Sequence, residues 1–204
     1  VSVTATESML MTAAIIPGKT ILKNCAMEPE IEALAEYLTK QGAKIKGIGS
    51  PTIIIEGAKK LKAGIFNVIP DRIETGSFAI LAAAANAEIK ITKCNPEHIM
   101  TLLTIFKKIG VNFETGKDWI QIKKSGRLIA SDIKTHEYPG FATDLQSPYV
   151  VLMTQVHGSA MIHETIYDRR LIWTDMLSQM GANITCSILI AFSFKVQANS
   201  MANV

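Results

Sequence analysis

Residues 28–47, EPEIEALAEYLTKQGAKIKG, decide the fold class, because the same order of signals returns twice further along the chain. Apolar residues recur there at the spacing of one helix face, at Ile31, Leu34, Ala35 and Leu38. Gly42 follows at the point where a glycine would end the helix in the left-handed conformation. The stretch predicts an amphipathic helix, a glycine stop and then a strand.

The same signals return in residues 95–114, NPEHIMTLLTIFKKIGVNFE, and in residues 168–185, DRRLIWTDMLSQMGANIT. The stop glycines of the three copies, Gly42, Gly110 and Gly181, are 68 and then 71 residues apart. Each of these helices follows a short β-branched strand, and each strand follows an apolar helix. The strands are expected at 20–23, 89–92 and 160–163, and the preceding helices at 8–15, 77–85 and 148–156.

A period near 70 residues with alternating helices and strands is too long for a solenoid of small repeats. It predicts an α/β (α+β) fold of three βαβαββ-like units, each of which buries one face against its neighbours. The first two units carry the signals of a closing hairpin, in residues 44–57 and 111–124. The third has no turn residues after Gly181, so residues 186–204 are expected to form an atypical tail that would aggregate if its edge were exposed.

The composition is that of a globular protein, with 48% hydrophobic and 19% charged residues. The net charge of +3 is too small to indicate a nucleic-acid partner. Three cysteines, at 25, 94 and 186, form no C-x-x-C pair, which favours reduced thiols and a cytoplasmic location. No apolar run reaches the roughly 18 residues of a membrane-spanning helix, so no membrane partner is expected.

Three apparent motifs are rejected. Residues 17–20, PGKT, look like the end of a P-loop, but Ala13 stands where the first glycine is required and Gly18 follows a helix instead of opening one. The histidines, at 98, 136, 157 and 163, lack zinc-binding spacing, so no metal or other cofactor is expected. Cys25 and Cys94 follow equivalent strands and are interpreted as small buried residues, in preference to nucleophiles.

Two stretches carry more charge and polarity than a helix or strand requires, PDRIETG at 70–76 and FATDLQSPYV at 141–150. With residues 28–49 and with HETIYDRR at 163–170, they resemble the UDP-N-acetylglucosamine 1-carboxyvinyltransferases. These are the enolpyruvyl transferases that open bacterial peptidoglycan synthesis. The likeness runs from Val1 to about Thr185, and PDRIETG is close to a signature of this branch.

The resemblance implies a fold of two domains, each an inside-out α/β barrel of three repeats, with the active site in the cleft between them. Residues 1–68 would be the last repeat of one domain, and residues 69–204 the first two repeats of the other. The chain would then be a fragment that lacks both ends of the family's sequence, with two incomplete barrels. Residues 68–78, VIPDRIETGSF, would form the crossing between the domains.

Members of this family add the enolpyruvyl group of phosphoenolpyruvate to the 3-hydroxyl of UDP-N-acetylglucosamine and release phosphate. The reaction needs a base for the hydroxyl, a proton donor for the methylene carbon and cations around the phosphate. Asp144 matches the family carboxylate that contacts the sugar and is proposed as the base. An aspartate at a helix start would also serve as an N-cap, which is the alternative role for Asp144.

Further residues match the family's nucleotide-sugar site. Val1, Ser2 and Val3 match the segment whose backbone and hydroxyl hold the nucleotide phosphates. Ile166 matches the residue that packs on the nucleotide, although its pattern alone would place it in the core.

Three charged residues match family positions beside the cleft, but the resemblance supports a ligand contact less strongly for them. Asp71 and Arg72 form one matching pair, for which an ion pair that fixes the domain junction is an equal alternative. Arg170 matches an arginine on the same wall as Ile166.

The chain also departs from the family pattern. Thr4 replaces a glycine beside the phosphate-holding residues, Met27 an arginine and Pro148 a glutamine. The family's reactive cysteine loop would lie upstream of Val1, and the arginines that grip phosphoenolpyruvate beyond Val204. The chain alone is therefore expected to be inactive. The alternative to a transferase is a truncated remnant or UDP-sugar-binding module, which would associate with itself or with a chain that supplies the missing repeats.

Overall fold

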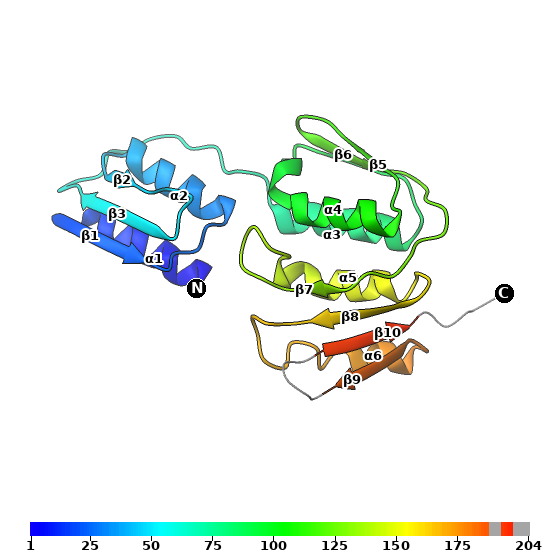
Figure 1. Cartoon of the computed structure of the whole chain (residues 1–204). Coiled ribbons are helices and arrows are strands. Elements are labelled where there is room, and N and C mark those ends of the chain that lie inside the picture. The colour runs from blue at the N-terminus through cyan, green and yellow to red at the C-terminus, as the bar shows by residue number, and fades with distance from the viewer. Residues whose placement is uncertain (188–192, 198–204) are drawn as a thin grey trace. The chain divides into compact units, whose positions relative to one another are not determined.

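The computed structural model describes the backbone of residues 1–187 and 193–197, and the side chains of residues 1–185. The chain divides into two compact units (Figure 1). Unit 1 comprises residues 1–69 with 137–139, and unit 2 comprises residues 70–136 together with the described residues from 140 onward.

Unit 1 has the order helix, strand, helix, strand, strand. Its elements are α1 (Val3–Ile15), β1 (Gly18–Lys23), α2 (Pro29–Lys40), β2 (Lys44–Lys46) and β3 (Thr52–Gly57). The strands form a sheet in the order β1-β3-β2, in which both pairings are antiparallel. Gly42 has a φ of +116°, so the glycine stop after α2 is confirmed.

Helices and sheet share one core in unit 1. On β3 the side chains of Ile53 and Ile55 are fully buried, because alternate residues of a strand point to the same face. Leu10 of α1 and Ile31 of α2 belong to the same cluster, so both helices cover that face. Full burial of each of these side chains contributes roughly 1.5–3 kcal/mol of transfer free energy.

Unit 2 contains two further repeats. The first consists of α3 (Arg72–Ala84), β4 (Ile89–Thr92), η1 (Pro96–Ile99), α4 (Met100–Ile109), β5 (Phe113–Thr115) and β6 (Trp119–Ile122). The second consists of β7 (Ile133–Lys134), η2 (Thr143–Leu145), α5 (Gln146–Met153), β8 (Ser159–His163), α6 (Thr174–Gln179), β9 (Asn183–Ser187) and β10 (Ser193–Gln197). The expected order of helices and strands is therefore confirmed. Among the described residues, the leading strand of a βαβαββ unit is present only in the last repeat, where β7 runs parallel to β8.

All three repeats close in the same way. The final strand lies between the other two, in the orders β1-β3-β2, β4-β6-β5 and β8-β10-β9. In the third repeat β10 pairs antiparallel with both β8 and β9. This differs from the expectation that the chain beyond residue 186 departs from the repeat. The rest of that expected tail, residues 188–192 and 198–204, lies outside the described residues.

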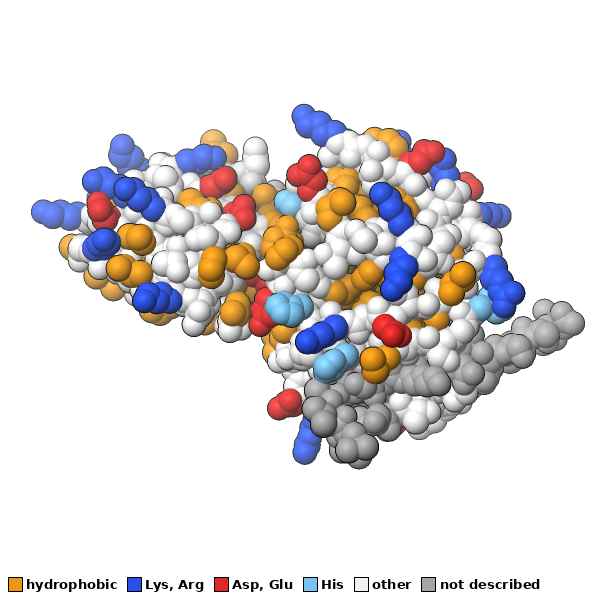
Figure 2. Space-filling model, in the orientation of Figure 1, with side chains coloured by type: hydrophobic (Ala, Val, Ile, Leu, Met, Phe, Trp, Pro, Cys, Tyr) orange, Lys and Arg blue, Asp and Glu red, His pale blue; other side chains and the backbone are white. Residues whose placement is uncertain are grey.

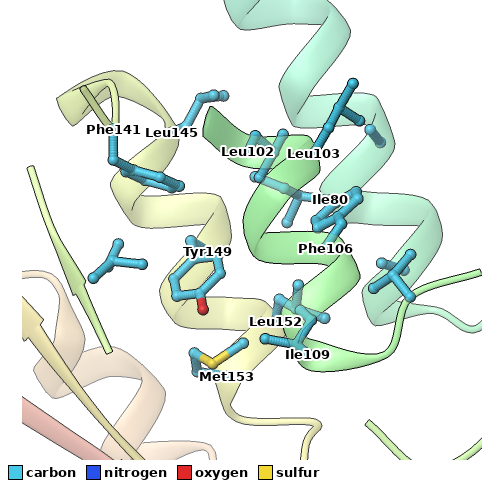
Figure 3. Packing of buried hydrophobic residues seen from close by; sticks show 14 of the residues in the cluster. Ile80, Leu102, Leu103, Phe106, Ile109, Phe141, Leu145, Tyr149, Leu152 and Met153 are labelled. Carbon is cyan, nitrogen blue, oxygen red and sulfur yellow. The ribbon is translucent and has the colours of Figure 1, made fainter. Parts of the chain in front are cut away.

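The core of unit 2 is formed by helices that lie between two sheets (Figure 1). Ile80 of α3, Phe106 of α4 and Tyr149 of α5 meet there, and each is at most 1% exposed (Figure 3). The Tyr149 hydroxyl donates to the carbonyl of Ser131 at 2.8 Å, which satisfies its one polar group. The α/β repeats are confirmed, and the described residues form no closed barrel.

Lysine and arginine side chains are spread over the visible surface among acidic and hydrophobic ones (Figure 2). Within the described part of the chain, no helix is both long and apolar enough to cross a membrane. The described residues also include no group of three or more His, Cys, Asp or Glu side chains arranged to hold a metal ion.

Candidate functional site

Asp144 lies in the short 3₁₀ helix η2, directly before α5. Its Oδ1 accepts a hydrogen bond from Nη2 of Arg170 at 2.7 Å, and the two side chains are 54% and 28% exposed. Neither η2 nor α5 receives a side-chain cap, so the N-cap alternative for Asp144 is wrong. The carboxylate is instead held by an arginine 26 residues further along the chain.

Arg170 is fixed from two directions. It lies in the loop that follows β8, where its guanidinium is placed over the ring of Tyr167 at 5.1 Å from the ring centroid. The aromatic face of Tyr167 attracts the guanidinium, while the carboxylate of Asp144 accepts a hydrogen bond from one N–H group of Arg170. The ion pair therefore joins the proposed base to Arg170, which the resemblance placed on the same wall of the site as Ile166.

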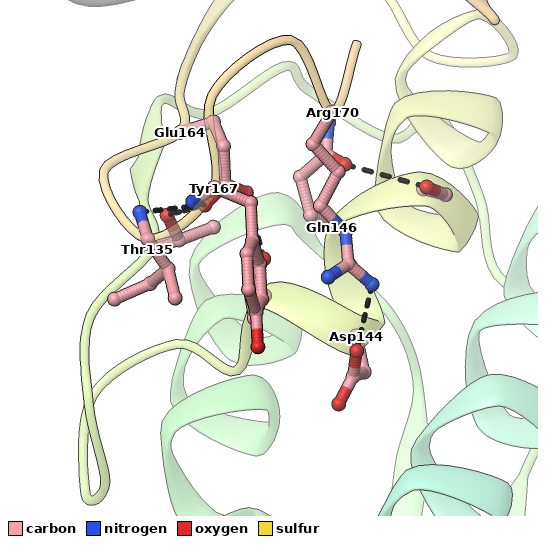
Figure 4. Close-up of polar contacts among 9 residues, drawn as sticks. Thr135, Asp144, Gln146, Glu164, Tyr167 and Arg170 are labelled. Carbon is pink, nitrogen blue, oxygen red and sulfur yellow. Dashed lines mark hydrogen bonds and ion pairs between the residues drawn. The ribbon is translucent and has the colours of Figure 1, made fainter. Parts of the chain in front are cut away.

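The loop itself is anchored by Glu164, which is only 3% exposed. Figure 4 shows Glu164 and Thr135 on one side of Tyr167, and Arg170 with Asp144 on the other. Both Glu164 carboxylate oxygens accept hydrogen bonds, from Thr135 to Oε1 and from Thr143 to Oε2, each at 2.9 Å. A buried carboxylate is tolerated only when its oxygens are satisfied in this way.

Ile166 lies in the same loop, between Glu164 and Arg170. Its backbone N–H donates to Oε1 of Glu164 at 2.8 Å, and its side chain is partly exposed. It is not among the residues of the buried core of unit 2. The core interpretation of Ile166 is therefore wrong, and the side chain has a surface that a ligand can contact.

Val1, Ser2 and Val3 lie at the start of α1 in unit 1. The Ser2 hydroxyl caps this helix by accepting from the backbone N–H of Ala5 at 3.3 Å. Val1 is 67% exposed, whereas Val3 packs against the core of unit 1. Thr4, which replaces the family's glycine, is an exposed residue of the first helical turn.

Asp71 caps α3, and Arg72 is the first residue of that helix. Oδ1 of Asp71 accepts from the backbone N–H of Ile73 at 2.7 Å and of Glu74 at 3.0 Å. A cap at Asp71 was not predicted from the sequence, although aspartate is among the best N-cap residues.

Comparison with known proteins shows the family of the chain. The family model of EPSP synthase (3-phosphoshikimate 1-carboxyvinyltransferase) matches residues 1–201. The chain belongs to the EPSP synthase family. Within the family, it is similar to curated proteins that are named UDP-N-acetylglucosamine 1-carboxyvinyltransferase.

One such relative, from Solibacter usitatus, is 42% identical over 185 residues. Another, from Shewanella pealeana, is 43% identical over 185 residues. Each alignment covers 90% of this chain and 44% of the relative. The resemblance stated from the sequence is confirmed, and this EPSP synthase family member spans less than half the length of the curated relatives that it matches.

A solved structure, the enolpyruvyl transferase NikO from Streptomyces tendae, superimposes with a TM-score of 0.83 over 96% of this chain. The match covers 46% of the NikO chain, at 20% sequence identity. At that identity the likeness shows the fold alone, and it confirms the fold of enolpyruvyl transferase repeats.

The family member's described cysteines are buried. Cys25 is 5% exposed and Cys94 4% exposed, and burial raises the pKa of both thiols. Since the thiolate is the reactive form, both are poor nucleophiles, and their interpretation as buried residues is confirmed. The side chain of Cys186 lies outside the described residues.

Glu164 and Thr135 of this family member were not predicted from the sequence. Alternation along β8 could have revealed Glu164, because Ala160 and Ile162 are fully buried and Glu164 occupies the next inward position. A charged residue at an inward position predicts a buried, hydrogen-bonded carboxylate. No local signal identifies Thr135, since its partners lie about 30 residues away.

Proposed function

We propose that this chain forms part of an enolpyruvyl transferase that joins phosphoenolpyruvate to the 3-hydroxyl of UDP-N-acetylglucosamine. The observation that carries the proposal is the ion pair between Asp144 and Arg170, at 2.7 Å. It presents a half-exposed carboxylate beside the loop of Ile166, in a chain 42% identical to a curated protein with that name. The reaction is the first committed step of peptidoglycan synthesis in the bacterial cytoplasm.

In this proposal Asp144 is the general base. Its Oδ1 is held by Arg170, so Oδ2 is the oxygen that receives the proton of the sugar 3-hydroxyl. The freed oxygen forms a bond to C2 of phosphoenolpyruvate, while a general acid of the whole transferase donates a proton to the methylene carbon. A general base then takes a proton from the resulting methyl group, the double bond reforms, and the C–O bond to phosphate breaks with release of phosphate.

Unit 1 has a binding role in the proposal. Val1 and Ser2, which are exposed, and Val3 contact the nucleotide phosphates. Ile166 packs on the nucleotide. We assign unit 1 to the last repeat of one barrel domain and unit 2 to the first two repeats of the other. Asp71 and Arg72 then stand at the start of the second domain, which the boundary between residues 69 and 70 supports.

A second candidate is a UDP-sugar-binding module without turnover of its own. It is favoured by the burial of Cys25 and Cys94, whose thiols have raised pKa values. Neither supplies the reactive cysteine with which the family is associated. In this case the chain holds UDP-N-acetylglucosamine, and the transfer requires groups from another polypeptide segment.

The test is calorimetric titration of UDP-N-acetylglucosamine into the chain and two variants. Asp144→Asn is expected to weaken binding by about tenfold or more, because hydrogen bonds to charged groups contribute roughly 1.5–3 kcal/mol. Asp118→Asn, at an exposed aspartate in the turn before β6, is the control and is expected to bind like the unaltered chain. Equal affinity of all three proteins would contradict the assignment of Asp144.

Phosphate release tests whether the chain turns over the substrates by itself. With phosphoenolpyruvate and UDP-N-acetylglucosamine present, the chain alone is expected to release no phosphate above a heat-inactivated sample. Release that disappears in Asp144→Asn would show turnover and reject the binding-module alternative.

A further inference from the structure

The carboxylate of Glu164 accepts four hydrogen bonds. Oε1 accepts from the Thr135 hydroxyl at 2.9 Å and from the backbone N–H groups of Ile166 and Tyr167 at 2.8 and 3.2 Å. Oε2 accepts from the Thr143 hydroxyl at 2.9 Å. These four donors are all uncharged, so the negative charge of this buried group is stabilised by oriented dipoles.

The donors come from three separate segments. Thr135 follows β7, Thr143 begins η2, and Ile166 and Tyr167 lie in the loop after β8. The loop is attached a second time, because Thr165 donates from its backbone N–H to the Thr135 hydroxyl at 2.9 Å and from its hydroxyl to the Thr135 carbonyl at 2.6 Å. Glu164 is therefore the point at which these three segments meet.

Each member of the Asp144–Arg170 ion pair adjoins a residue that is hydrogen-bonded to Glu164. Thr143 directly precedes Asp144, and Tyr167 lies under the guanidinium of Arg170. We propose that Glu164 is a positioning residue that holds Asp144 and Arg170 in the geometry for binding and deprotonating the sugar hydroxyl. The inference rests on the proposed function, but the claim that Glu164 holds Asp144 and Arg170 in place can be tested in the chain without substrate.

An amide in place of the carboxylate changes both the charge and the direction of one hydrogen bond. Glutamine has one acceptor oxygen and an NH₂ group with two donors, whereas Thr143, Thr135 and the two backbone N–H groups all donate. In Glu164→Gln the amide oxygen can keep the three donors at the Oε1 position, while the NH₂ group faces the Thr143 hydroxyl, which must then accept instead of donate. The substitution therefore removes the negative charge and reverses the bond to Thr143 at constant side-chain size, and this separates hydrogen bonding from packing.

The experiment compares Thr143→Val and Glu164→Gln with the unaltered chain. Thr104→Val is the matched control, because it also removes one hydroxyl hydrogen bond, to the carbonyl of Met100 within α4. The first measurement is the solvent exchange of the Arg170 guanidinium protons by NMR. The second is the dissociation constant of UDP-N-acetylglucosamine.

Thr143→Val and Glu164→Gln are expected to speed the exchange of the Arg170 guanidinium protons. They are also expected to raise the dissociation constant of UDP-N-acetylglucosamine by about tenfold, as a lost hydrogen bond to a charged group would. Thr143→Ser, which restores the hydroxyl, is expected to return both values to those of the unaltered chain. A purely structural role would lower the melting temperature of Thr143→Val without changing Arg170 exchange.

The outcomes separate this inference from the proposed function. Arg170 exchange in Thr143→Val equal to that in Thr104→Val overturns the inference, whether or not the nucleotide sugar binds. Failure of the unaltered chain to bind the nucleotide sugar counts against the proposed function, and guanidinium exchange alone then decides whether Glu164 positions Arg170. If Glu164→Gln does not fold, Thr143→Val still decides, because it leaves the carboxylate in place.

Discussion

At the scale of single residues, the ion pair of Asp144 and Arg170 matters more for chemistry than for stability. Both side chains are partly exposed, and ion pairs of this kind contribute only about 0.2–1 kcal/mol, because water screens the charges. Asp144→Asn is therefore expected to lower the free energy of unfolding by less than about 1 kcal/mol. A larger loss in urea unfolding would show that Asp144 is mainly a structural residue.

The two buried thiols make stability depend on pH. Burial raises the pKa of Cys25 and Cys94 in the folded chain above the unfolded value of about 8.5. Their contribution to stability is complete below that unfolded value and is lost as pH rises through the folded pKa, because the folded chain then holds protons that the unfolded chain has released.

We therefore expect the free energy of unfolding to fall as the pH rises above about 8.5. The double variant Cys25→Ala, Cys94→Ala should show a shallower fall over the same range, whatever its stability at pH 7. Urea titrations at several pH values measure both slopes. Equal slopes would contradict a role of these thiols in the pH dependence.

At the scale of elements, α3 explains much of the stretch PDRIETG. Asp71 caps the helix, and Gly76 allows a close approach to η2. A Cβ atom at residue 76 would lie 2.8 Å from Cδ1 and 2.9 Å from Cδ2 of Leu145, which is 3% exposed and precedes α5. The glycine thus brings α3 against the turn that carries Asp144.

Gly76→Ala tests this contact. In an open helix, alanine in place of glycine stabilises by about 0.5–1 kcal/mol. Here we expect destabilisation by about 1–3 kcal/mol, because buried Leu145 must shift to accept the methyl group. In a Leu145→Ala background the same change should be stabilising. Chemical unfolding of the four proteins gives the comparison, and stabilisation by Gly76→Ala alone would contradict the close contact.

At the scale of the whole molecule, α1 is apolar on more than its core-facing side. Leu10 and Ala14 are fully buried in unit 1, while Met9, Met11 and Ile15 are 50%, 48% and 58% exposed. A helix that is hydrophobic all round is normally covered on both sides. The exposed side chains of α1 therefore favour association with another copy of the chain.

We expect this chain to form oligomers at micromolar concentration. Met11→Lys with Ile15→Lys should reduce the association, because the charges would have to be buried in any contact over this face. Ile65→Lys is the control, since Ile65 is 97% exposed and lies outside α1. Light scattering with size-exclusion chromatography measures the mass. A monodisperse monomer of the unaltered chain would contradict the prediction.

The sequence by itself determined the repeat, the class of fold and the candidate base. Helix faces, strand runs and stop glycines are properties of neighbouring residues, so Gly42, Gly110 and Gly181 marked three helix ends before any contact was known. Asp144 and Ile166 were found through a resemblance that lies in contiguous stretches. These signals can be recognised in the sequence because each depends on residues that lie close together along the chain.

Only the tertiary structure decided how distant residues meet. It placed β10 between β8 and β9 and paired Asp144, for which a helix cap was the alternative role, with Arg170. It also brought Thr135 to Glu164, 29 residues away. Such pairings depend on which buried faces the sheets and helices bring together and on which buried polar groups must then be satisfied. That requirement is met in space, by partners that the local pattern does not specify.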